Sequence, residues 1–172
     1  MDDFNDRRDN VAIAIGKIMY HMDEVHSYFT TIPNPISFCC SHQLVDTFRL
    51  RLLLIADELA VIDHPNNDIG ICPKIPNLEK ILEAREIVGS TAFVGDQSVG
   101  TDCDSVTEYI WTMWTREIPA LRSALTGISI DNSRIAAVAQ NTRERMAYSQ
   151  EADRTRWLKK LIKNMNDEEN GE

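Results

Sequence analysis

The stretch LVDTFRLRLLLIADELAVI, residues 44–62, decides the fold. Its apolar side chains recur in steps of three or four residues, so they fall on one face of an α-helix. These residues are Leu44, Phe48, Leu52, Ile55, Leu59 and Ile62. Val45, Leu53 and Leu54 widen the same face. A helix with so broad an apolar face is expected to lie at the centre of the core, with the other helices around it.

The same periodicity predicts four more helices. Residues 5–29 carry a single apolar stripe, and its members are Val11, Ile15, Ile18, Met22, Val25 and Phe29. Shorter apolar patterns predict helices over 77–88 and 105–125. A last pattern runs from 131 or 132 to 165 and weakens near its middle. It predicts either one long helix or two helices with a bend.

Capping and breaking residues set the expected ends of these helices. Ser41 is a plausible N-cap of the central helix, and Asp131 or Asn132 is the expected N-cap of the last one. Gly127 is expected to end the preceding helix near Leu125. Pro119 is expected to kink or interrupt that helix, because proline lacks the backbone N–H that a helix interior requires.

Proline-, glycine- and asparagine-rich segments at 30–40, 64–76 and 89–101 separate the helices and are expected to be loops. No segment alternates between polar and apolar residues as a half-buried strand does. We therefore predict an all-α fold, an irregular bundle of about five helices in a single domain over 1–166. The acidic residues 167–172 are expected to form a disordered tail.

Charge is distributed unevenly along the chain. Residues 1–130 hold 10 basic and 19 acidic side chains, whereas residues 131–166 hold 8 basic and 4 acidic ones. An acidic body repels nucleic acid and attracts basic protein surfaces. The expected partner is therefore another protein with a basic surface, and nucleic acid is an unlikely one.

The N-terminus, MDDFND, is acidic where a signal peptide would be basic. No apolar run approaches the roughly 18 residues that a membrane span requires. Both features favour a cytoplasmic protein without a membrane partner.

The segment YHMDEVHS, residues 20–27, is the most suggestive of metal chemistry. Asp23 and His26 are three residues apart, which is the spacing of an acid–histidine metal pair on one helix. Both point away from the apolar stripe of that helix, so we predict a solvent-exposed flank with a contact between them and no metal. His21 is expected on the opposite flank of the stripe.

Four cysteines, Cys39, Cys40, Cys72 and Cys103, lack the C-x₂-C spacing of zinc modules. They are predicted to be free, partly buried thiols. No cofactor is expected.

The stretch FRLRLLLIADELAVIDH resembles the all-α nucleotide pyrophosphatases of the MazG kind in forming a long aliphatic helix that ends in acids. The resemblance implies Mg²⁺-dependent hydrolysis of nucleoside triphosphates, with about four carboxylates from two helices holding the metal. The matching residues are Asp57, Glu58, Glu83 and Glu86. The first acidic set of the family has the pattern Glu-Glu-x-x-Glu. Asp57 and Glu58 match its first two acids, but Val61 stands in place of the third, so this chain departs from the pattern there.

Two surfaces are candidate protein contacts. Glu79, Glu83 and Glu86 are four and three residues apart and form an acidic stripe on a predicted helix. Near the C-terminus, basic residues accompany apolar ones, and the candidates there are Arg154, Trp157 and Lys160. That basic helix would dock on its own acidic body or lie in solvent, or it would bind a partner.

The leading hypothesis is a small acidic protein that acts by binding another protein, as an inhibitor, immunity protein or antidefence antagonist does. No complete catalytic set is present in the sequence, so an enzyme is the less favoured class. The alternatives are the Mg²⁺-dependent hydrolase and a structural subunit of a helical assembly, in which the chain would oligomerise.

Overall fold

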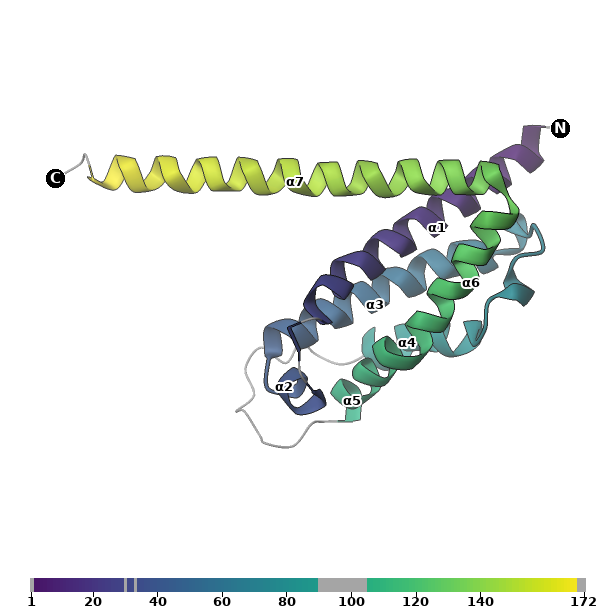
Figure 1. Cartoon of the computed structure of the whole chain (residues 1–172), viewed down its shortest axis with the longest axis horizontal. Coiled ribbons are helices and arrows are strands. Elements are labelled where there is room, and N and C mark those ends of the chain that lie inside the picture. The colour runs from purple at the N-terminus through teal and green to yellow at the C-terminus, as the bar shows by residue number, and fades with distance from the viewer. Residues whose placement is uncertain (1, 30, 33, 90–104, 170–172) are drawn as a thin grey trace.

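The structure is a computed structural model that describes residues 2–29, 31–32, 34–89 and 105–169. Within these ranges the fold is all-α, with no strand, as predicted. The α-helices are α1 (Asp2–Phe29), α2 (Pro35–Cys39), α3 (His42–Asp63), α4 (Leu78–Gly89), α5 (Ser105–Thr112), α6 (Ile118–Asp131) and α7 (Ser133–Glu169). Figure 1 shows α1, α3, α4 and α6 gathered into one body, with α7 starting at one end of it and running along its edge.

Helix α3 is the centre of the core, as its sequence predicts. It packs against α1 on one side and α4 on another. Phe48, Leu52 and Ile55 are fully buried. Ser41 caps its N-terminus by accepting a hydrogen bond from the backbone N–H of Leu44 at 3.4 Å.

Helix α2 lies inside the segment that the sequence predicts as a loop. Pro35 occupies its first turn, where the missing N–H costs nothing. Asn34 caps it, and its Oδ1 accepts a hydrogen bond from the Ser37 backbone N–H at 2.9 Å. This short helix buries Phe38 against Phe48, with ring centroids 4.9 Å apart. Pro33 and Pro35 favoured a loop prediction for this segment, which is wrong for 35–39. The helix there supplies Phe38, one of the largest side chains of the core.

Helices α5 and α6 form one continuous helix that contains a π-helical turn, Met113–Glu117. In that turn the Ile118 N–H bonds to the Met113 carbonyl, five residues back. The turn directly precedes Pro119, whose ring would clash with a carbonyl four residues back in a regular α-helix. The predicted interruption at Pro119 is confirmed, and it takes the form of this wide turn.

Gly127 does not end this helix. Helix α6 continues through it to Asp131, because an exposed glycine is compatible with a helix interior at a cost of about 1 kcal/mol. Asn132 begins the next helix, and its Oδ1 accepts a hydrogen bond from the Ile135 N–H at 3.3 Å. Of the two predicted caps, Asn132 is the one used.

Helices α1 and α7 approach each other closely at Gly16. A Cβ atom at this position would lie 2.5 Å from the Ala139 carbonyl oxygen and 2.8 Å from the Thr142 Cβ. Only a residue without a side chain fits this distance. The glycine in the middle of a long helix therefore sets how near α7 lies to α1.

Helix α7 is one unbroken helix of 37 residues. It begins on the body beside α1, and its C-terminal part extends beyond the other helices (Figure 1). The helix reaches Glu169, three residues into the segment assigned to the tail from the sequence, and 170–172 lie outside the described residues. The predicted loop at 89–101 also lies outside them, except for Gly89.

In the part of the chain that the structure describes, no helix combines the length and the apolar character that crossing a membrane would require.

Candidate functional site

Asp23, from the segment that suggested a metal site, holds three helices together. Its carboxylate pairs with Arg122 of α6 and with Arg143 of α7. The predicted contact between Asp23 and His26 is therefore replaced by two guanidinium partners that the sequence did not reveal, since they follow Asp23 by 99 and 120 residues. His26 is exposed, as predicted.

His21, which the sequence places on the other flank of the apolar stripe, is buried, with 5% of its surface exposed. Its Nδ1 lies 2.9 Å from Arg51 Nη1. Because arginine can only donate, Nδ1 must be the acceptor and the ring must be neutral. Burial, with the nearby charges of Arg51 and Lys17, lowers the pKa of His21 from 6.5 to about 4.

This lowered pKa predicts that acid destabilises the fold through His21. The unfolded chain takes up a proton near pH 6.5, whereas the folded chain does so only near pH 4, so stability falls as the pH drops between these values. The loss between pH 7 and pH 5 is expected to be about 2 kcal/mol. Urea unfolding at both pH values measures it.

His21→Gln is the matched control, because its amide oxygen still accepts a hydrogen bond from Arg51 but does not titrate. The variant is expected to lose about 2 kcal/mol less stability than the unmodified protein over the same pH interval. Equal losses in both proteins would show that His21 titrates normally in the folded state.

The carboxylates of the possible hydrolase site do not converge. Glu58 faces α1 and binds Lys17 at 2.8 Å, whereas Asp57 faces α4 and binds Arg85 at 2.8 Å. Glu83 and Glu86 are exposed on α4. Among the described residues, no group of three or more acidic, histidine or cysteine side chains is arranged to hold a metal ion. Helices α3 and α4, which would supply the four carboxylates, do pack against each other. However, Asp57 and Glu58 already pair with basic side chains.

The acidic stripe, Glu79, Glu83 and Glu86, lies on the outer side of α4, where all three residues are exposed. The basic side chains of the same helix are engaged elsewhere. Lys80 pairs with the buried Glu117 of the π turn, and Arg85 pairs with Asp57. The stripe therefore presents carboxylates without a basic residue of α4 to neutralise them.

The prediction of four free thiols is wrong for one cysteine. Cys39 forms a disulfide, whereas Cys40 and Cys72 are free. Cys72 is partly buried, as predicted, but Cys40 is exposed. Cys103 lies outside the described residues. Cysteine spacing in the sequence carried no signal for this bond, because pairing depends on which loops meet in space.

The candidate residues Arg154, Trp157 and Lys160 lie on the C-terminal arm, which we define as residues 151–169 of α7. Just before the arm, Gln150 Nε2 donates a hydrogen bond of 2.8 Å to Glu24 Oε2 of α1. Every side chain from 151 to 160 is exposed, including Trp157 at 62% and Leu158 at 49%. The side chains of 151–160 are therefore not buried against the acidic body, although the charge of Arg154 reaches Tyr20 of α1.

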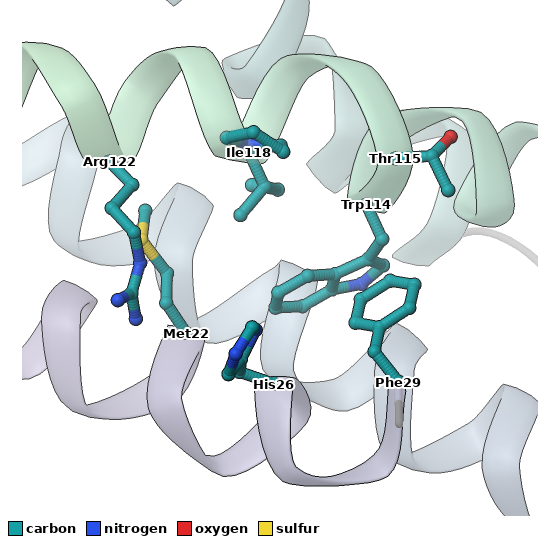
Figure 2. A pocket seen from close by; sticks show the side chains of 8 residues that line it. Met22, His26, Phe29, Trp114, Thr115, Ile118 and Arg122 are labelled. Atoms are coloured by element: carbon teal, nitrogen blue, oxygen red, sulfur yellow. The ribbon is translucent and has the colours of Figure 1, made fainter. Parts of the chain in front are cut away.

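A pocket of about 420 Å³ lies between α1 and the continuous helix α5–α6 (Figure 2). It is lined by Met22, His26, Phe29, Trp114, Thr115, Ile118, Pro119 and Arg122. Sequence reasoning missed it, because its walls come from two segments separated by more than 80 residues. Pro119 was the available signal, since the wide turn that it imposes forms one wall.

The chain matches no protein-family model, no curated protein and no solved structure, so its geometry carries the functional argument.

Proposed function

We propose that this chain acts by binding another protein, and that the C-terminal arm is the segment that binds. The observation that carries the proposal is the exposure of every residue from 151 to 160 on a helix that extends past the body. Most helices in proteins are stabilised by packing of one face, and a lone helix in water is marginal. The described side chains of the arm have no such packing within the chain, and a partner that packs against the arm would supply it.

Trp157 and Leu158 are the expected anchors of this contact. Tryptophan is enriched among the residues that contribute most to protein interfaces, because its large ring fills a pocket on the partner. The apolar sequence pattern continues at 161 and 162, one turn further along. Apolar residues three or four positions apart are the anchors by which an amphipathic helix binds in a hydrophobic groove.

The charge of the arm indicates which kind of groove on a partner would fit it. Between 154 and 166 the sequence holds five basic residues and no acidic one, namely Arg154, Arg156, Lys159, Lys160 and Lys163. Complementary charge steers partners together and fixes their register. The partner of the arm is therefore a protein with an apolar groove bordered by carboxylates, and occupying that groove would make this chain an antagonist of the partner.

The acidic stripe of α4 is the second surface in this proposal, and it fits a partner with a basic face. The ion pairs of Lys80 with Glu117 and of Arg85 with Asp57 favour it, because they direct both basic side chains of α4 away from the stripe. An acidic surface of this kind acts mainly on the rate of encounter. The two surfaces differ in sign and in composition, so they can be tested separately.

The test begins with the partner that the immobilised chain retains from an extract of its native host. Once that partner is purified, Trp157→Ala is expected to weaken its affinity by at least about 30-fold, the effect of removing an interface anchor. Surface plasmon resonance measures the affinity and both rate constants. Ile36→Ala is the matched control, because Ile36 is also apolar and 72% exposed but lies on α2.

The charge-reversed variant Glu79→Lys/Glu83→Lys/Glu86→Lys separates the two surfaces. If the stripe contacts the partner, association slows by at least about tenfold and the effect fades as salt rises. Unchanged affinity in Trp157→Ala together with slow association in the reversed variant would assign the contact to α4 and contradict the arm. A mass above 19.6 kDa that rises with concentration, without any partner, would favour the alternative of a self-assembling structural subunit.

A further inference from the structure

The pocket at the π turn has a rigid aromatic end. Trp114 is 3% exposed, and its indole N–H donates to the Phe48 carbonyl oxygen at 3.0 Å, which fixes the orientation of the ring. Phe29 packs against Phe48 and Trp111, with ring centroids 5.2 and 5.8 Å apart. Both rings are held from behind by the core, so this end of the pocket is preformed for an apolar group.

The other end of the pocket is cationic. Figure 2 shows Arg122 at the end away from Trp114 and Phe29, with Ile118 and His26 between them. Arg122 and Arg143 share the single carboxylate of Asp23, so the cluster carries one more positive than negative charge. His26 has no hydrogen bond or ion pair within the described ranges, and its ring lines the pocket.

We propose that this pocket binds a small aromatic carboxylic acid. The ring of the ligand lies against Trp114 and Phe29, and its carboxylate is held near Arg122 and His26. The volume of about 420 Å³ is within the range of small-molecule sites, which combine apolar walls with a few polar groups. An anion at this end offsets the excess positive charge, and the guanidinium group has N–H donors to share with a second carboxylate.

The π turn is what opens the space. It inserts a five-residue turn where α5 meets α6, and Trp114, Thr115 and Ile118 at this junction all line the pocket. Such wide turns occur frequently at functional sites. Thr115 is exposed at the rim, and its hydroxyl donates back to the Trp111 carbonyl oxygen at 2.8 Å, so its own polar group is already satisfied.

The test uses phenylacetate, 3-phenylpropionate, 4-phenylbutyrate and indole-3-acetate as probes on the full chain. Titration followed by calorimetry and by NMR shifts of the indole N–H groups is expected to give a dissociation constant below about 1 mM for at least one acid. The uncharged amide of that acid is expected to bind at least about tenfold more weakly, because it lacks the charge that Arg122 recognises.

Two matched pairs of variants place the binding in the pocket. Thr115→Trp fills the rim and is expected to abolish binding, whereas Thr126→Trp, an exposed threonine of α6 with the same backbone hydrogen bond but outside the pocket, leaves it unchanged. Arg122→Gln is expected to weaken binding at least about tenfold, and more than Arg143→Gln does. Both variants lose one partner of Asp23, but only Arg122 lines the pocket.

Absence of binding by all four acids at 5 mM, about five times the highest expected constant, would overturn the proposal. Equal affinity for acid and amide, or binding that survives Thr115→Trp, would also overturn it. Circular dichroism of each variant confirms the fold, and Thr126→Trp shows whether an added tryptophan on this helix is tolerated.

Discussion

Replacing Leu52 or Ile55 by alanine is expected to lower the free energy of unfolding by roughly 2–5 kcal/mol in each case. Both side chains are fully buried on α3, between α1 and α4. Alanine removes apolar contacts and leaves a cavity that the surrounding helices fill only partly. Urea unfolding followed by circular dichroism gives the free energy and shows whether the transition remains cooperative.

Leu50→Ala is the matched control for Leu52→Ala, because it is the same substitution two residues away on the same helix. Leu50 is 49% exposed. Its replacement is expected to change stability by about 0.5 kcal/mol or less, as for most surface substitutions. A loss of the same size at Leu50 and Leu52 would contradict the central place of Leu52 in the core, and helix propensity could not explain it because alanine is a better helix former than leucine.

Gly16→Ala and Gly127→Ala are expected to change stability in opposite directions. The added methyl group at Gly16 would meet backbone and side-chain atoms of α7 at 2.5 and 2.8 Å, so α7 must move away from α1. Overpacking of this kind costs about 1–3 kcal/mol. At Gly127 the methyl group meets nothing within 4 Å, and alanine is expected to stabilise α6 by roughly 0.5–1 kcal/mol.

Thermal unfolding of the two variants measures this difference. Accelerated proteolysis of α7 in Gly16→Ala would show that the helix has separated from α1, whereas Gly127→Ala should be cleaved no faster than the unmodified chain. Stabilisation by alanine at both positions would mean that α7 adapts without cost, and that the close approach is not required.

The sequence predicts the helices well where one face of each is buried. The stripes of α1 and α3 follow the helical period because those helices pack on the core along their length, and Leu52 and Ile55 are buried for this reason. Short elements are different. Helix α2 has only five residues, too few to show a period, and its two flanking signals, Asn34 and Pro35, also occur in loops.

The surroundings of His21 and the pocket at the π turn were less predictable from the sequence, because both depend on contacts between distant segments. His21 lies on the flank of the α1 stripe, as its position requires, yet Arg51 and Tyr20 cover it. The pocket requires the π turn, and a proline indicates a break in a helix without indicating the form that it takes. The exposure of the acidic stripe was predictable from spacing, whereas spacing left open whether the basic segment of α7 docks on the body or extends from it.

The attachment of α7 to α1 has a consequence for the order in which the chain folds. Asp23 and Glu24 contact Arg143 and Gln150, so these contacts close loops of 120 and 126 residues. Long loops are entropically costly to close, and contacts of this kind form late. During synthesis, the surface of α1 around Gly16 therefore stays open to solvent until α7 has left the ribosome, and the docking of α7 then covers it.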